Sequence, residues 1–536
     1  MKFSKGKFLK KKNELFLALS ILVSACANVV SPTGGPKDET APKLVSENPK
    51  NKTLNFAEKK IEIEFNEMVQ LKNQYKEISI TPEMELAPEI TAKKNTVIIK
   101  FVDTLSKNTT YSINFGNSIA DINESNEYKN YHYVFSTGKF IDSLKISGTV
   151  DYIIDTAQTK EVLVALYPTD IEKLYKQKPI IYTSTTTGGK YELNNIKNGK
   201  YAIYAYKDLN GNKRFDDDEL LGFLNNNVDL QKDSSKINFT LAKQVPKNLR
   251  VSYSKYYEGR VLVKLNYPDD SVNFNVFYPN EFKNKLLIDK ASSDSISLWL
   301  PTTKFDSTQI QLTKNGKPFD TLMVRNFIKD PKLGLFKITD NVSSGILKPN
   351  DTLKLTTSRP LKLADVTKLE LLEDSVKIKT GFTITPSKKK IREYIVTYEW
   401  DSTKKYDINI KERQFTDIYD AFNAQYKRTF IQDTSANYGI VSAKFTIPKD
   451  KQYIVQLLNT NQEIVGQLIA NENKVYKFIN LTPERYKMRF IEDANKNKKW
   501  DIGNVYHKIQ PEKISYYPDE IAVRAGWDME VNVNLE

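Results

Sequence analysis

Apolar and polar residues alternate with a period of two along most of this 536-residue chain. The alternation is clear in Lys60–Asn66 (KIEIEFN), Asn95–Val102 (NTVIIKFV) and Thr110–Gly116 (TYSINFG). Successive side chains of an extended strand point to opposite faces, so such runs indicate strands with one buried face. Outside isolated helical turns near Thr169–Lys176 and Phe415–Ala424, the chain has no helical pattern. The pattern therefore predicts an all-β fold built as a string of antiparallel β-sandwiches.

One stretch of the chain occurs twice. Residues 190–219 return without a gap at residues 475–504, an offset of 285 positions. Each copy predicts two short strands followed by a loop with oxygen-bearing side chains at every second position. The repeat indicates a duplicated β-module. The matched pairs are Tyr191/Tyr476, Leu193/Phe478, Ile196/Leu481, Tyr201/Tyr486, Asp208/Asp493, Asn210/Asn495, Asn212/Asn497, Phe215/Trp500 and Asp216/Asp501.

Two segments resemble known domain families. Residues 40–138 contain IEIEFNEMV, LSKNTTYSINFG and a closing FSTG, and this series resembles the bacterial Ig-like domain of S-layer-type proteins. Residues 140–243 contain SGTV, VALY and GKYELNNIKNGKYAIYAYKD, which is similar to the transthyretin-like, carboxypeptidase-regulatory-type sandwich. The second resemblance implies a structural or binding appendage.

The second half repeats this plan. Residues 246–335 predict a β-sandwich spacer. Residues 340–435 predict a second Ig-like domain, in which Tyr406–Ile410 aligns with Tyr111–Phe115 at an offset of 295 positions. Residues 437–536 hold the second copy of the repeat and predict a second transthyretin-like domain.

The amino terminus predicts a secreted, lipid-anchored protein. Residues 1–25 combine a basic start with an apolar run, Leu15–Val23, that is shorter than the about 20 residues needed to span a bilayer. The run ends in VSAC, which resembles a bacterial lipobox and implies a lipoprotein signal peptide, with lipid attached to Cys26 (palmitate among the acyl chains). Residues 26–39 are a tether. The tether and the Ig-like segment together resemble lipoproteins of the Bacteroidota.

The same resemblance predicts where the protein is anchored. Ala27 is not the aspartate that retains lipoproteins in the inner membrane, so anchoring in the outer membrane is expected. An acidic cluster after Cys26, the surface-export signal of this phylum, is missing from the sequence ANVVS. The periplasmic face is therefore favoured over the cell surface.

The repeated loop has the oxygen spacing of a calcium site. With Asp208 as position 1, positions 3, 5, 7, 9 and 12 of an EF-hand-type loop fall on Asn210, Asn212, Arg214 (backbone carbonyl), Asp216 and Glu219. Lys213 stands at position 6, where the sharp turn prefers glycine, so weak structural Ca²⁺ binding is expected. A polar turn that bonds its own backbone is the alternative. The second copy predicts a weaker site, because Asn504 takes position 12; its ligands are Asp493, Asn495, Asn497 and Asp501.

Composition narrows the function. One cysteine excludes an internal disulfide. The formal charge of +14 falls to +9 without the leader, which holds six lysines and one glutamate. With two histidines, and without HExxH, GxSxG or a glycine-rich phosphate loop, the sequence predicts no enzyme.

These features favour a monomeric, non-catalytic envelope scaffold or binding module. Its expected partners are the membrane, through the lipid anchor, and an envelope protein or glycan, but not nucleic acid. The alternative is a carbohydrate-active or peptidase accessory enzyme chain with dispersed carboxylates.

Overall fold

The computed structural model describes residues 37–84, 86–154, 161–290, 294–328 and 332–535. Cys26 and the beginning of the tether lie outside these residues. Strands make up nearly all of the regular structure, and the predicted all-β fold is confirmed. The described helices are short: α2 (Gln74–Glu77), α3 (Glu172–Lys176) and the 3₁₀ turns η1 (Asn280–Phe282), η2 (Val366–Lys368) and η3 (Ser435–Asn437).

The expected helical turn near Thr169–Lys176 is α3, but the turn expected near Phe415–Ala424 is wrong. There, Thr416 and Phe422 form an isolated antiparallel bridge. The buried Asp417 carboxylate accepts the N–H groups of Tyr419 (2.8 Å) and Ala421 (3.0 Å), so these donors are held outside a helix.

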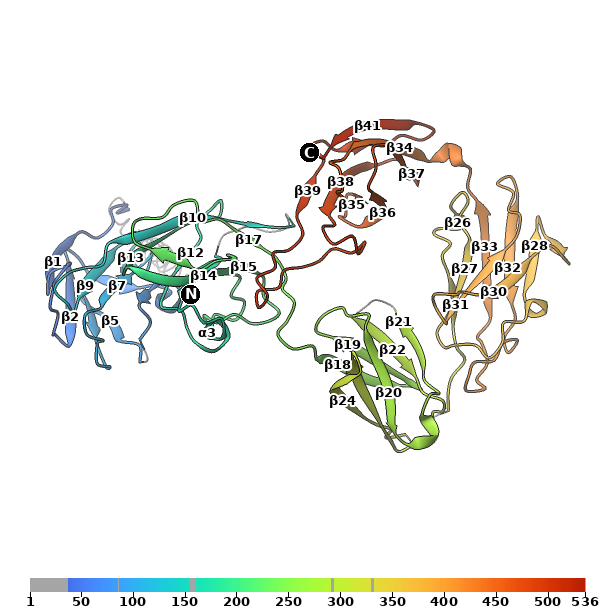
Figure 1. Ribbon diagram of the computed structural model, residues 1–536, viewed down its shortest axis with the longest axis horizontal. Helices are drawn as coiled ribbons and strands as arrows, with labels where there is room; N and C mark the ends of the chain where they lie inside the picture. The colour runs from blue at the N-terminus through green and yellow to red at the C-terminus, as the bar shows by residue number, and fades with distance from the viewer. Residues whose placement is uncertain (1–36, 85, 155–160, 291–293, 329–331, 536) are drawn as a thin grey trace, which may run out of the picture. The chain divides into compact units, whose positions relative to one another are not determined.

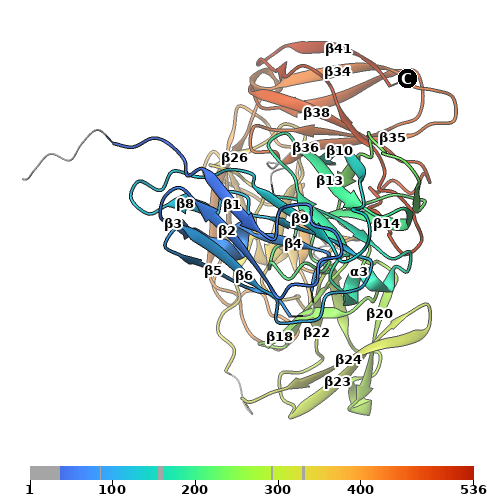
Figure 2. The same ribbon diagram turned by 90° about the vertical axis from the view of Figure 1, so that its left-hand side faces the viewer.

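The chain divides into two compact units. The first comprises Met1–Ser143 with Asn195–Lys197, and the second comprises the remaining residues. In the first unit, four strands lie side by side (Figure 2), in the order β1 (Leu44–Asn48), β2 (Lys60–Phe65), β6 (Thr96–Lys100), β5 (Glu89–Lys93). The other strands form the sheet β4 (Ser79–Thr81), β7 (Thr110–Asn114), β9 (His132–Ser136) and the pair β3 (Val69–Leu71), β8 (Ile119–Asp121).

The alternation in the sequence explains the core of the first unit. Ile61, Ile63 and Phe65 of β2 are fully buried, and the glutamates between them are partly exposed. Ile113 of β7 and Phe135 of β9 belong to the same apolar cluster. Each strand therefore contributes one face, as a sandwich requires.

Apart from Asn195–Lys197, the two copies of the repeat lie in the second unit, and they have the same strand order. In the first copy, which we call the first module, one sheet has the order β13 (Lys190–Ile196), β10 (Leu144–Tyr152), β17 (Phe239–Leu241). The other sheet has the order β12 (Ile181–Ser184), β11 (Leu163–Tyr167), β14 (Gly199–Tyr206), β15 (Leu221–Phe223), and β16 (Val228–Leu230) also pairs with β14. In the second copy, the second module, one sheet has the order β37 (Val475–Leu481), β34 (Gly439–Thr446), β41 (Asp528–Asn534). The other sheet has the order β36 (Ile464–Ala470), β35 (Tyr453–Leu458), β38 (Arg485–Glu492), β39 (Ile514–Tyr516), and β40 (Ile521–Ala522) also pairs with β38.

In both modules the first strand pairs in parallel with the last. Val150 of β10 is opposite Phe239 of β17, and Ile440 of β34 is opposite Asp528 of β41. Figure 1 shows β34 and β41 side by side near the carboxyl terminus. A parallel pair needs a long connection, and here the whole of each module provides it.

Two further sandwiches connect the modules along the chain. The first has the sheets β18 (Val251–Tyr257), β19 (Arg260–Leu265), β22 (Ser295–Trp299), β21 (Leu287–Lys290) and β20 (Val272–Tyr278), β23 (Ser307–Lys314), β24 (Lys317–Arg325). The second has β25 (Ile338–Asp340), β27 (Leu353–Thr357), β31 (Glu393–Thr397), β30 (Thr383–Pro386) and β26 (Ile346–Leu347), β33 (Tyr426–Gln432), β32 (Lys405–Ile410), β28 (Glu370–Glu373), β29 (Val376–Ile378). The order β25-β27-β31-β30 repeats the order β1-β2-β6-β5 of the first unit.

A core substitution in the first unit tests this packing. Ile113→Ala removes a fully buried side chain and is expected to cost about 2–5 kcal/mol of unfolding free energy. Hydrogen exchange of the β7 peptide in the full chain should then be at least about 30-fold faster. Ile122→Ala, at a side chain that is 48% exposed, is the control and should leave the exchange unchanged. Equal effects of the two substitutions would contradict the assigned core.

Candidate functional site

The first polar loop, Asp208–Glu219, follows β14 and is shaped by bonds to its own backbone. Asp208 Oδ1 accepts the N–H of Gly211 (2.8 Å), and Asp208 Oδ2 accepts the N–H of Lys213 (2.9 Å). Gly211 and Lys213 both have left-handed backbones, with φ of 74° and 59°. Lys213 therefore adopts a conformation that usually favours glycine, and the bond to Asp208 helps to hold it there.

The side chains predicted as ligands do gather in this loop. The side-chain amides of Asn210 and Asn212 both donate to Asp216 Oδ2, at 2.8 and 2.9 Å. Their Oδ1 atoms accept the N–H groups of Asn212 (3.0 Å) and Arg214 (2.6 Å). The amide nitrogens therefore face Asp216, and the amide oxygens bond the backbone.

Glu219 ties the two ends of the loop together. Its side chain is 1% exposed, with Oε1 accepting the N–H of Leu209 (2.8 Å) and Oε2 accepting the N–H of Asp216 (3.2 Å). Burial raises the pKa of Glu219 to about 7, and the charges of Asp208 and Asp216 act in the same direction. The two N–H bonds oppose this shift because they stabilise the carboxylate.

An aromatic side chain fixes the middle of the loop in the core. Phe215 is buried and meets the rings of Tyr175 and Tyr206 edge to face, at centroid distances of 5.3 and 6.2 Å. Its counterpart Trp500 is half-buried, and its indole N–H donates to the backbone oxygen of Glu512 (3.3 Å).

The second polar loop, Asp493–Glu512, repeats these contacts. Asp493 Oδ2 accepts the N–H of Lys498 (2.9 Å), the position that matches Lys213. Asn495 and Asn497 both donate through their side-chain amides to Asp501 Oδ2. Lys496 and Lys498 have φ of 59° and 65°, so the left-handed residues also recur at the matching sites.

The predicted ligand set of the second polar loop lacked its glutamate. Position 12 fell on Asn504, whose N–H instead donates to the backbone oxygen of Ile509 (2.8 Å) in a short hairpin. Glu512 makes the bonds of Glu219: Oε1 accepts the N–H of Ala494 (2.7 Å) and Oε2 that of Asp501 (3.0 Å). The offset is 285 positions at Asp501 and 293 at Glu512, so eight extra residues separate them. The strand that follows the second loop, β39, aligns with β15 at the larger offset of 293 positions, and this alignment could have indicated the insertion.

The described residues contain no group of three or more Asp, Glu, His or Cys side chains that could hold a metal ion. In the first polar loop, the Asn amide nitrogens stand beside Asp216 where a cation would need oxygens. The calcium sites stay a prediction. Cys26 lies outside the described residues, so its lipidation stays a prediction as well. Among the described residues, no helix is long and apolar enough to cross a membrane.

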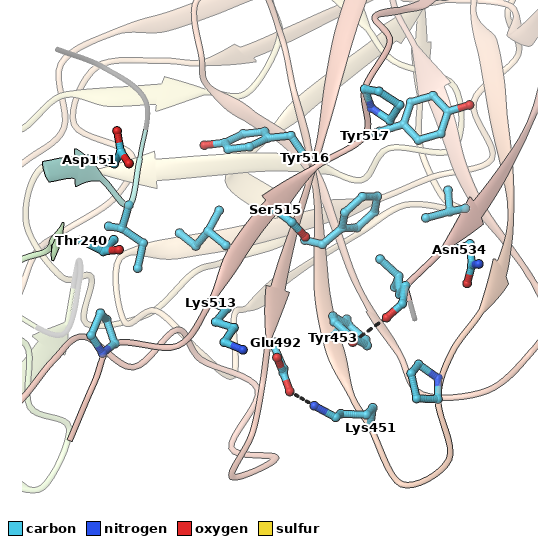
Figure 3. Close-up of a pocket in the computed structure, with 18 of the residues that line it drawn as sticks. Asp151, Thr240, Lys451, Tyr453, Glu492, Lys513, Ser515, Tyr516, Tyr517 and Asn534 are labelled. Carbon is cyan, nitrogen blue, oxygen red and sulfur yellow. Dashed lines mark hydrogen bonds and ion pairs between the residues drawn. The ribbon is translucent and has the colours of Figure 1, made fainter. Parts of the chain in front are cut away.

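A groove with a volume of about 1270 Å³ lies in the second unit (Figure 3). Residues of both modules line it, and five of them are aromatic: Tyr152, Tyr453, Phe490, Tyr516 and Tyr517. Pro448, Pro511 and Pro518 add rigid apolar surface. Aromatic rings and prolines suit the apolar faces of an extended peptide or of sugar rings.

Two carboxylates lie in the lining of the groove. Its carboxylates are Asp151 and Glu492, and Glu492 is ion-paired with Lys451. Figure 3 shows Asp151 and Glu492 pointing to different parts of the groove. Glu219, whose pKa is raised to about 7, is buried in its loop. This arrangement favours binding over catalysis by paired carboxylates.

Comparison with known families identifies one domain. Residues 38–137 match the bacterial Ig-like domain Big_5, so the Ig-like fold predicted for residues 40–138 is confirmed. A comparison with curated proteins gives no match.

Several solved structures resemble the chain at low identity. They include BcpA, the major pilin subunit of Bacillus cereus, with 11% identity over 73% of this chain and 99% of that chain, at a TM-score of 0.14. An alpha-2-macroglobulin fragment from Escherichia coli has 10% identity over 52% of this chain and 98% of that chain, at 0.18. The I9–I11 tandem of titin has 9% identity over 53% and 100%, at 0.13. Scores this low carry no argument about function.

The buried glutamate predicts a dependence of stability on pH. In calcium-free buffer, the folded first module holds a proton on Glu219 up to a pKa of about 7, whereas the unfolded chain releases it near 4.5. The unfolding free energy should therefore fall as the pH rises from about 4.5 to about 7, and level off above that range. Glu219→Gln should reduce this fall, as measured by melting curves of the full chain. An unchanged pH profile in the variant would show that Glu219 titrates normally.

Proposed function

We propose that this protein is a non-catalytic lipoprotein, anchored through Cys26 in the outer membrane on its periplasmic face, that acts as an envelope scaffold or binding module. The observation that carries the proposal is the amino terminus. The one cysteine of the chain stands directly after a basic, apolar leader with the sequence VSAC. Two or more acyl chains at that position attach a protein stably to a membrane, whereas one chain does not.

The β-sandwiches support a scaffold or binding role. The aromatic groove of the second unit is their candidate binding surface. An extended segment of an envelope protein, or a glycan, could pack its apolar surface against the aromatic rings of this groove. The Lys451–Glu492 ion pair and Asp151 would contribute hydrogen bonds at the edge.

We further propose that each polar loop binds Ca²⁺ weakly. The carboxylates of Asp208 and Asp216 repel that of the buried Glu219, and a cation would offset this repulsion. Rotation of the Asn210 and Asn212 amides would turn their oxygens inward, and the backbone carbonyl of Arg214 would complete the set. The second polar loop would use Asp493, Asn495, Asn497 and Asp501, now together with Glu512. We expect dissociation constants of roughly 10⁻⁴–10⁻³ M.

The anchor is tested by substitution of Cys26. A Cys26→Ser chain with residues 1–25 replaced by an ordinary secretory leader should appear in the soluble fraction and incorporate no palmitate analogue. The control Ser24→Ala keeps the cysteine and should stay with the outer membrane. If the Cys26→Ser chain still sediments with the outer membrane after a salt wash, the anchor lies elsewhere.

Calcium binding is tested on the full chain by calorimetry without Ca²⁺ and with Ca²⁺ at roughly 10–100 mM, a hundredfold excess over the expected dissociation constants. At a hundredfold excess over the dissociation constant, binding to the folded state adds about 2.7 kcal/mol, so the melting temperature should rise by several degrees. Asp208→Ala/Asp216→Ala should remove the contribution of the first polar loop, and Asp493→Ala/Asp501→Ala that of the second. Trp500 fluorescence reports on the second loop alone when Trp500→Phe is the reference. An equal rise in a chain with all four substitutions would show that neither loop binds calcium.

A further inference from the structure

The residues between Asp501 and Glu512 in the second polar loop contact the first module. Ile502–Pro511, which we call the clasp segment, contacts the first module at both of its ends. The N–H of Val245 donates to the backbone oxygen of Gly503 (2.7 Å), next to a parallel bridge between Gly503 and Gln244. Gln510 donates through its side-chain amide to the backbone oxygen of Phe223 (2.9 Å), 287 residues away.

The middle of the clasp segment enters the core of the first module. Val505 is fully buried in the apolar cluster that contains Tyr204, Phe215 and Phe223. Tyr506 stacks on Tyr175 with a centroid distance of 5.4 Å and an interplanar angle of 17°. A residue from one module therefore completes the core of the other.

The contact between Gly503 and Gln244 leaves no room for a larger residue at position 503. A Cβ atom at Gly503 would stand 2.6 Å from Oε1 of Gln244. Gln244 is 2% exposed, and its amide donates to the backbone oxygens of Leu221 (2.9 Å) and Ala242 (3.1 Å), so it is fixed in place. Glycine at position 503 allows the two backbones to approach closely.

The second polar loop presents the clasp segment as a small hairpin. Asn504 and Ile509 exchange backbone hydrogen bonds of 2.8 and 3.0 Å. Glu512 holds the base of the hairpin through Asp501 N–H. In the first polar loop the corresponding gap is filled by Asp217 and Asp218 alone, so the loop itself closes without the hairpin.

We propose that the face of the first module formed by Tyr175, Tyr204 and Phe223 is a binding site whose ligand is the clasp segment of the same chain. The first module then reaches its full stability only when the second is folded. This role does not depend on the lipid anchor. The insertion that distinguishes the two copies then has a function. The second module provides the clasp segment, and the first module provides the surface that binds it.

The test uses hydrogen exchange of the full chain. Residues 502–511 are replaced by Asp-Asp, the two residues of the first polar loop, so that the second loop can still close. Val505→Asp is a second variant that keeps the segment. In both, peptides of β14 and β15 should exchange at least tenfold faster than in the unaltered chain. Peptides of β34 and β41 should keep their rates, which shows that the second module is folded.

The control is Ile509→Asp, in the same hairpin, where the side chain is 57% exposed. It should leave the exchange of β14 and β15 unchanged. Unchanged rates in the replacement variant would overturn the proposal. Equal acceleration by Val505→Asp and Ile509→Asp would do so too, because it would show that the burial of Val505 has no special role.

Discussion

One carboxylate between two backbone N–H groups holds each polar loop closed. A chain that leaves one strand and enters the next through an irregular loop has N–H groups without partners at both ends. Glu219 bonds one at the start of its loop and one near the end, and Glu512 does the same in the second copy. The cost is the removal of a charge from water, complete for Glu219 and partial for Glu512, and it is seen in the raised pKa of both glutamates. The N–H bonds offset part of that cost.

This closure explains how the copies could diverge. Glu219 accepts a hydrogen bond from the backbone of Asp216, and Glu512 accepts one from the backbone of Asp501. Because this bond closes the loop, the number of residues between the aspartate and the glutamate can vary. Two residues fill the interval in the first copy and ten in the second. The longer interval forms a hairpin without disturbing the loop below it, and the hairpin places Val505 in the core of the first module. A local hydrogen-bond arrangement thus permits a contact between distant parts of the chain.

The sequence was a sound guide where structure depends on neighbours along the chain. Period-two alternation identified β2, β6 and β7, because a half-buried strand must alternate. Glu512 was missed because the insertion breaks the constant offset. Val505 and Ile509 are both apolar and four residues apart, yet one is fully buried and the other is 57% exposed. That difference is set by a module almost 300 residues away, which no local pattern reports. Counting oxygens also could not show which of them the backbone N–H groups already occupy.

The parallel pairing of first and last strands has a mechanical meaning. The first module is entered through β10 and left after β17, and the two strands run in the same direction. Tension along the chain would pull β10 and β17 in opposite senses along their length. The hydrogen bonds between them would then carry the load together, in shear, and would not open one by one as in a peeled hairpin. A module with this geometry resists tension along the chain without any added covalent link.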